Sequence, residues 1–432
     1  MSTISFKLVI VFCSALLCWA VYRDIHLEKQ YAGDLRNRVV GARMQKDGLS
    51  PYFYKWKQGD GLRYYDPHNF DSLQVSNVTG SPFFHCLLYP VADLPQQTIS
   101  RLWLLFEYAA LALMLLMAFL IAQTQAQKGL VLLTGSLMLL TESWKAHIGA
   151  GQYYLFIPLL MLCFVYSIRK TAIYFSAVAG LCTAALLLIR PTTMFFFLPF
   201  LFLLKQYTTR WKIVFFLPFV LAIAWLLAST RQQYLWAQYR KNIAQQVLLH
   251  QEESPAVQHN ASNPGYADWE GISKGKIAQE EAAFPIKIFS ENGNVFVIVN
   301  ELLHKKINKT WLSVIAAIGI IFLLMAFVIR HRASGFAMAA TALLGFSCYM
   351  LTDIFSPVHR HQYYGVQWFF PLLLIAALYT PMQQKWWIPL GAGLLLTIVN
   401  LKSIPMEHTI GEYLLLLGCN FLSLKRETLP LP

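Results

Sequence analysis

The feature that most constrains this chain is a series of apolar stretches separated by short polar segments. Twelve such stretches follow one another along the 432 residues, at positions 6–22, 102–121, 129–140, 153–166, 172–189, 193–204, 213–228, 311–329, 335–351, 364–379, 386–400 and 411–424. A helix needs about 20 apolar residues to cross a bilayer, so the shorter stretches predict tilted or re-entrant helices. We therefore expect an all-α polytopic integral membrane protein with about twelve transmembrane helices, in one domain over residues 1–432.

The composition argues against a soluble globule of this length. Hydrophobic residues make up 56% of the chain and charged residues only 13%, which leaves too few polar side chains to cover a water-facing surface. The net charge of +13 comes from Lys and Arg scattered between apolar stretches, so no nucleic-acid partner is expected. Six of the seven cysteines lie inside apolar stretches and only Cys86 lies in a predicted loop, so neither a disulfide framework nor a zinc site is predicted.

The positions of the basic residues predict the orientation of the helices. If the N-terminus lies in the cytoplasm, every short inner loop is basic. The residues concerned are Lys128, Arg169, Lys170, Lys205, Arg210, Lys212, Arg330, Arg332, Lys385, Lys425 and Arg426. The short outer segments carry mixed charges, so the reverse orientation breaks the positive-inside rule repeatedly. On this map two long hydrophilic segments, 23–100 and 230–310, lie on the outer face together with the short loop 352–362.

An acidic residue stands near the start of the first long outer segment. Asp34 follows the first apolar stretch by about a dozen residues and begins a polar run that extends to Tyr52. A carboxylate at the boundary of water and lipid is suited to act as a general base. The same acid would equally cap a juxtamembrane helix or pair with Arg36 or Arg38, and the spacing alone favours this structural role.

Short motifs spread over most of the chain carry a family resemblance. They are the run 34–52, the sequence SPFFHCLLYP at 81–90 with Leu94-Pro95, Gly151-Gln152, LLIRP at 187–191, and SPVHRH at 356–361 leading to Pro371. Together they resemble glycosyltransferase family 87, which belongs to the GT-C superfamily of membrane enzymes. The resemblance implies a GT-C-type bundle with 23–100 as the loop of the catalytic acid, 230–310 as a second large loop and 352–362 as a histidine-containing loop.

The resemblance also implies an activity and a location. Such a protein is an inverting hexosyltransferase that takes a sugar, commonly mannose, from a polyprenyl-phosphate donor. It transfers the sugar to a glycolipid or glycan acceptor on the periplasmic side of a bacterial inner membrane. Asp34 would be the catalytic base. No D-x-D metal motif is present, so no metal and no cofactor are expected.

Cationic side chains are the candidates for the donor phosphate. Arg190 stands between two apolar stretches, where an unpaired charge is costly, so an anionic partner is expected. Its guanidinium fork suits a phosphodiester, whereas snorkelling to the interface is the structural alternative. The family often has lysine at this position. It also places a histidine near the acid and the phosphate, and here His359 and His361 are both candidates, with a solvated loop histidine as the alternative.

A second polar group lies at the outer end of neighbouring apolar stretches. Within it, Lys145 is a candidate for the donor phosphate, and Gln152 and His147 are candidates for substrate binding. Arg360, between the two loop histidines, is a further candidate for substrate binding. Glu107, inside the second apolar stretch, has no motif around it and is interpreted as an interhelical polar contact.

Two other functions are compatible with a polytopic chain. A flippase of lipid-linked oligosaccharides or a secondary transporter would use intramembrane polar residues to line a path, but two long loops on one face argue against it. An O-antigen polymerase or ligase also has a large outer loop, but needs no acid directly after the first helix. We therefore expect a glycosyltransferase that works at the surface of the lipid bilayer.

Overall fold

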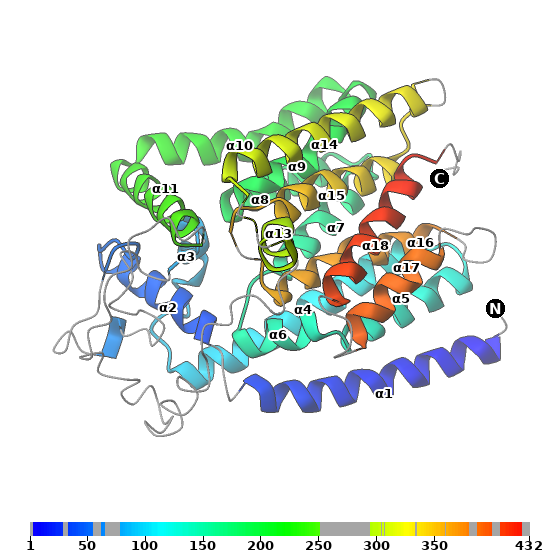
Figure 1. Cartoon of the computed structure of the whole chain (residues 1–432), viewed down its shortest axis with the longest axis horizontal. Coiled ribbons are helices and arrows are strands. Elements are labelled where there is room, and N and C mark those ends of the chain that lie inside the picture. Colours follow the sequence, from blue (N-terminus) through cyan, green and yellow to red (C-terminus); the bar gives the residue numbers. More distant parts are fainter. Residues whose placement is uncertain are drawn as a thin grey trace.

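A computed structural model describes residues 3–28, 33–54, 62–64, 78–250, 294–303, 305, 307–332, 335–358, 360–379, 387–399 and 407–425. The regular elements in this part of the chain are all helices (Figure 1). They are α1 (Thr3–Glu28), α2 (Gly33–Lys46), η1 (Leu62–Tyr64), α3 (Pro82–Leu88), α4 (Gln96–Ile121), α5 (Gln125–Met138), α6 (Glu142–Ala150), α7 (Phe156–Ile168), α8 (Ile173–Ile189), η2 (Pro191–Thr193), α9 (Met194–Phe197), η3 (Leu198–Gln206), α10 (Thr209–Ala228), α11 (Thr230–His250), α13 (Val295–Leu303), α14 (Lys309–His331), α15 (Met338–Ile354), η4 (Gln362–Trp368), α16 (Phe369–Leu378), α17 (Trp387–Ile398) and α18 (Glu407–Ser423).

Every predicted apolar stretch coincides with helical structure, so the all-α membrane fold is confirmed. Among the described residues, four helices are long and apolar enough to cross a membrane by themselves, namely α1, α4, α10 and α14. The stretch 193–204 forms the short α9 followed by the 3-10 helix η3, where Pro199 lies near the start. The total of about twelve spans stays a prediction.

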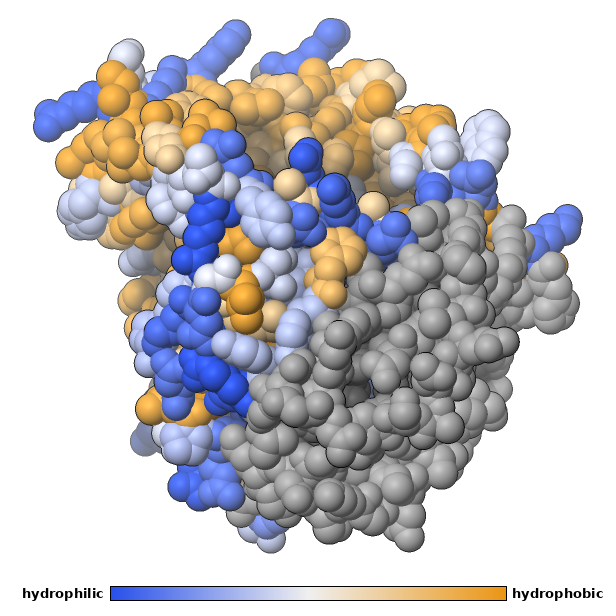
Figure 2. Space-filling view, turned by 90° about the vertical axis from the view of Figure 1, so that its left-hand side faces the viewer, coloured by the Kyte–Doolittle hydropathy of each residue, from blue (hydrophilic) through white to orange (hydrophobic). Residues whose placement is uncertain are grey.

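The apolar surface of the bundle is of the kind that faces lipid. Leu221 and Leu227 of α10 and Ile318 and Ile329 of α14 each expose more than half of their side chains, as do many of their neighbours. Exposing so large an apolar surface to water is unfavourable, whereas contact of the same surface with lipid is not. Figure 2 shows hydrophobic residues along the upper part of the molecule, where α10 and α14 lie in Figure 1.

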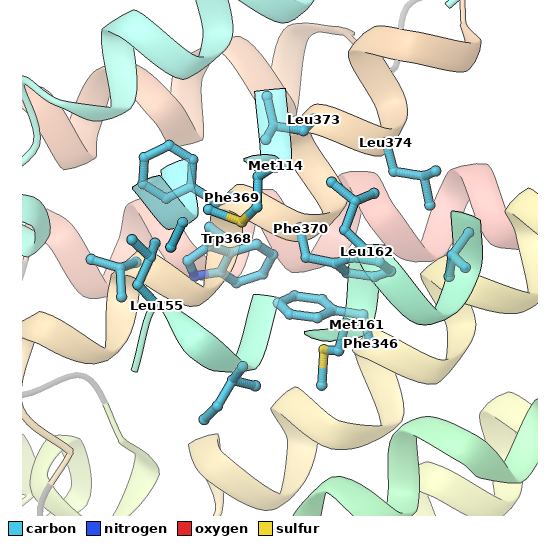
Figure 3. Close-up of a cluster of buried hydrophobic side chains, with 14 of the residues drawn as sticks. Met114, Leu155, Met161, Leu162, Phe346, Trp368, Phe369, Phe370, Leu373 and Leu374 are labelled. Atoms are coloured by element: carbon cyan, nitrogen blue, oxygen red, sulfur yellow. The ribbon is translucent and has the colours of Figure 1, made fainter. Parts of the chain in front are cut away.

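The centre of the bundle is built around α16. Residues 369–377 of this helix are all buried, which agrees with a helix that is apolar on every side. It packs against α4, α5, α7 and α15. Figure 3 shows this core, formed by Met114, Leu155, Met161, Leu162, Phe346, Trp368, Phe369, Phe370, Leu373 and Leu374.

Polar elements collect at one end of the bundle. Helices α2, α3 and α11 lie there, whereas the first turn of α1 and the last turn of α18 lie at the opposite end (Figure 1). Asn242 of α11 donates hydrogen bonds from Nδ2 to the backbone oxygens of Tyr52, at 2.8 Å, and Val78, at 3.3 Å. The two long segments predicted for the outer face therefore contact each other. Much of the second one, 251–293, lies outside the described residues.

Candidate active site

Asp34 lies in the first turn of α2, where a negative charge interacts favourably with the helix dipole. Its carboxylate oxygen Oδ1 is 3.8 Å from Nη1 of Arg38, and its side chain is 41% exposed. Both structural roles that the sequence left open, a place at a helix start and a pairing with arginine, are therefore present. The carboxylate nevertheless stays accessible, which a general base requires.

Gln152 joins Asp34 to Arg38. Its amide nitrogen Nε2 donates a hydrogen bond to Oδ2 of Asp34, and its amide oxygen Oε1 accepts one of 2.6 Å from Nη2 of Arg38. The Gln152 side chain is fully buried. The structure thus brings together the candidate base and the family-like glutamine, although 118 residues separate them.

Local backbone chemistry explains how Gln152 reaches this place. Gly151 ends helix α6 in the left-handed region, with φ 63° and ψ 49°, which is favourable only for glycine. The turn allows the backbone N–H of Gln152 to donate to the oxygen of His147 at 3.1 Å. Nε1 of Trp103 donates to the backbone oxygen of Gln152 at 3.2 Å. Gln152 is therefore held on both sides of its backbone.

His361 is the loop histidine that the structure describes. Its ring stacks on that of Tyr363 with centroids 5.0 Å apart, and the ring of Tyr363 lies 5.5 Å from that of Tyr154. The pKa of His361 is lowered: burial lowers it, the charge of Asp34 opposes this, and the charge of Arg38 adds to it. Through Tyr363, His361 therefore reaches the tyrosines that follow Gln152. His359, the other candidate, lies outside the described residues.

Arg190 directly follows α8 and has the anionic partner that its position predicts. Its Nη2 donates to Oδ1 of Asp353, near the end of α15. Its other terminal nitrogen, Nη1, is buried and has no hydrogen-bond partner among the described residues. The guanidinium also lies over the ring of Tyr154, 5.1 Å from its centroid. Asp353 therefore holds Nη2 of Arg190, and Nη1 has no hydrogen-bond partner among the described residues.

Two further charged groups extend this network. Nε of Arg360 is 3.3 Å from Oδ2 of Asp353, and Nη2 of Arg360 is 2.6 Å from Oε2 of Glu412 in α18. Arg360, Asp353 and Glu412 are all buried. Two arginines and two carboxylates therefore balance each other, as a buried charge requires.

A pair of tyrosines connects the two parts of the site. The rings of Tyr153 and Tyr154, which directly follow Gln152, stack with centroids 4.8 Å apart. Arg38 lies over Tyr153 at 4.9 Å, and Arg190 lies over Tyr154 at 5.1 Å. The acid with its arginine and the Arg190 network thus flank one aromatic pair.

The remaining candidates have partners within the protein. Nε2 of His147 is 3.0 Å from Oε2 of Glu107 and both side chains are buried, so Glu107 makes the expected contact between helices. Lys145 pairs with Glu142 and is 32% exposed. Direct contacts of His147, Lys145 and Arg360 with a substrate stay predictions.

Helix α3 covers α2 and carries a histidine that the sequence did not single out. Ser81 starts this helix, since its hydroxyl accepts from the N–H of Phe84 at 3.2 Å and Pro82 follows it. His85 is fully buried, and neither ring nitrogen has a hydrogen-bond partner among the described residues. Burial lowers the pKa of His85 to about 3, with Arg38 acting in the same direction. His85 therefore adds no charge beside Arg38.

Sequence reasoning missed the polar partners of the site. Asp353 is one of the mixed charges of the short outer segments and was not singled out as a partner, and neither were Glu412 and the tyrosine pair. The position of Tyr153 and Tyr154 directly after Gly151-Gln152 was the one available signal. In the described part of the chain, no three His, Cys, Asp or Glu side chains are grouped to hold a metal ion.

Of the comparisons with known proteins, the one with protein families agrees with the motifs. No curated protein matches the chain. A solved structure, the oligosaccharyltransferase of Archaeoglobus fulgidus in the apo form, is similar with a TM-score of 0.41 and 11% identity, over 95% of this chain and 56% of that one. This chain therefore spans little more than half the length of that protein. Residues 79–271, which include Gln152 and Arg190, match glycosyltransferase family 87, so the resemblance predicted from the motifs is confirmed over that range.

Proposed function

We propose that this protein is a membrane glycosyltransferase that moves a sugar from a polyprenyl phosphate to an acceptor hydroxyl. The sugar that we propose is mannose. The family match supports the class of enzyme. The observation that carries the proposal is the accessible carboxylate of Asp34, held through one oxygen by Gln152 at the end of the bundle where α2, α3 and α11 gather. We place this end on the periplasmic side, as the charges of the short loops indicate.

The proposed reaction is one in-line displacement. Asp34 takes the proton of the acceptor hydroxyl, and the oxygen of that hydroxyl attacks the anomeric carbon of the sugar. The bond between that carbon and the phosphate oxygen breaks on the opposite side, and the phosphate keeps the electron pair. The configuration is inverted and no covalent enzyme intermediate forms. The charge that develops on the phosphate then needs a cation.

Arg190 is the group we assign to that charge. Its Nη1 has no hydrogen-bond partner among the described residues, and a guanidinium binds phosphate oxygens through directed N–H groups. Asp353 holds the Nη2 edge and thereby orients the fork. His361, which stacks on Tyr363, is assigned to the same end of the donor.

A transfer assay with the purified full chain tests the proposal. Radiolabelled polyprenyl-phosphate mannose is incubated with the protein and with membrane glycolipids from cells that lack it. We expect Asp34→Asn to lower the rate by about 10²–10⁴-fold, since it removes the base. Asp93→Asn is the matched control, because Asp93 is an exposed acid that pairs with Lys46 and Arg63. Near-wild-type turnover of Asp34→Asn would overturn the assignment, and a transporter or flippase would show no transfer at all.

The phosphate assignment is tested separately in the same assay. Arg190→Ala should raise the donor KM and lower kcat, while Arg190→Lys, which keeps the charge and loses the fork, should retain part of the activity. Full activity of Arg190→Ala would remove the phosphate assignment alone.

A further inference from the structure

The contact between Arg38, Gln152 and Asp34 has only one chemically allowed arrangement. An arginine only donates hydrogen bonds, and an ionised carboxylate only accepts them. The Gln152 amide between them must therefore turn its oxygen to Arg38 and its nitrogen to Asp34, as the 2.6 Å contact from Nη2 of Arg38 indicates. Oxygen and nitrogen of an amide are otherwise hard to assign, but here the two neighbours decide the assignment.

The three side chains are also restrained. The Arg38 side chain is 5% exposed, donates to the backbone oxygen of Asp34 one helical turn earlier, and packs over Tyr153. Burial by itself lowers the pKa of Arg38, but the charge of Asp34 and the neighbouring tyrosines raise it overall, so the guanidinium stays charged. Gln152 is fully buried. No water is needed to complete this chain of contacts.

We propose that Arg38 is a positioning residue, which acts through the Gln152 amide to fix the carboxylate of Asp34. Gln152 then holds Oδ2, and Oδ1, which accepts no hydrogen bond among the described residues, is left for the acceptor hydroxyl. The inference rests on the proposed function, because it assigns Asp34 as the base. It adds a group that touches no substrate and still controls which oxygen of the base is available.

Removal of Arg38 has a definite geometric consequence. In Arg38→Ala the amide oxygen of Gln152 loses its donor, and the amide is free to turn away from the carboxylate. Asp34 then loses the N–H that holds Oδ2, and its side chain can leave the productive position. Because the substrate is not touched, kcat should fall by about 10–100-fold with little change in KM.

Arg43 provides the matched control on the same helix. It is buried like Arg38, but it donates to the backbone oxygens of Ala92, at 2.6 Å, and Leu94, at 3.3 Å, rather than to the site. Arg43→Ala should lower stability and leave kcat per folded molecule close to that of the wild type. Two variants that keep the side-chain volume complete the set. Arg38→Lys should restore part of kcat, and Gln152→Glu, which puts a second carboxylate against Asp34, should lower kcat as Arg38→Ala does.

A second readout does not depend on turnover. Structures of the purified full chain and its variants, determined by cryo-electron microscopy, show directly where the Gln152 amide and the Asp34 carboxylate lie. We expect the contact between Nε2 of Gln152 and Oδ2 of Asp34 to be lost in Arg38→Ala and to stay in Arg43→Ala. An unchanged contact in Arg38→Ala would overturn the inference. A lost contact in a protein whose wild type transfers no sugar would overturn the proposed function and leave the control of Asp34 by Arg38 standing.

Discussion

Asp24 and Asp34 lie ten residues apart where the chain leaves α1, and the structure surrounds them differently. Asp24 is fully buried and accepts three hydrogen bonds, from Nε of Arg23 at 2.7 Å, the hydroxyl of Tyr108 at 2.7 Å and Nε1 of Trp144 at 2.6 Å. Asp34 is 41% exposed and accepts from Gln152 alone among the described side chains. A saturated carboxylate fixes structure, whereas a partly held and accessible one is free to take a proton.

Helix α6 supplies a donor to each of the two acids. Trp144, in its first turn, donates to Asp24, and Gln152, two residues beyond its end, donates to Asp34. The same short helix therefore ties the base to the part of the bundle where α1 is anchored. The two roles can be separated by mutation.

Asp24→Asn is expected to have the largest effect on stability. The variant leaves Arg23 without its counter-charge and turns an amide N–H₂ towards groups that are themselves donors. We expect a loss of about 3 kcal/mol in the free energy of unfolding. It is measured as a lower Tm and a lower denaturant concentration at the unfolding midpoint for the protein in detergent. Transfer activity per folded molecule should remain far above that of Asp34→Asn.

Asp34→Asn gives the converse result in this comparison. Because Asp34 is partly exposed, its substitution should leave Tm within a few degrees of the wild type. Equal losses of stability in the two variants would remove the distinction between anchor and base. Loss of activity in well-folded Asp24→Asn, with Asp34→Asn active, would exchange their roles.

The helices were predictable because each depends on residues close in sequence. The apolar stretches 102–121 and 311–329 coincide with α4 and α14 within a few residues. The same periodicity does not reveal the break of 193–204 into α9 and η3, which depends on backbone hydrogen bonding around Pro199. The number of spans depends on tilt in a bilayer, which apolar length alone does not determine.

The polar pairs were less predictable, because each depends on how distant helices meet. Arg190 was expected to have an anionic partner, but Asp353 lies 163 residues away and its charge alone does not select it. Arg360 was predicted to bind substrate and lies in buried ion pairs with Asp353 and Glu412. The sequence did not predict a structural role for Asp24, because an acid next to Arg23 near a helix end is common. Its burial and its contact with Trp144 appear only in the structure.

Gly151→Ala sharpens the comparison at the Asp34 end of α6. A Cβ at φ 63° costs about 1 kcal/mol, and relief of that strain would move Gln152 away from Asp34. We expect kcat to fall about tenfold and Tm to fall by a few degrees. Gly149→Ala is the control, because Gly149 lies inside the same helix and nothing lies within 4 Å of an added Cβ, so stability should be unchanged or slightly higher. Wild-type activity in Gly151→Ala would show that the turn does not position Gln152.

The smallest expected effect is a change in the titration of His361. Burial lowers the pKa of this histidine, and the negative charge of Asp34 opposes that change. Asp34→Asn removes the opposing charge, so the pKa of His361 should fall further and the ring should stay neutral to lower pH. Asp24→Asn should leave it in place, because Asp24 is not among the charges that act on His361. NMR of isotope-labelled histidine, with the signal assigned by His361→Gln, measures both variants. A rise in Asp34→Asn, or an equal change in the two, would contradict the placement of His361 beside the base rather than beside the anchor.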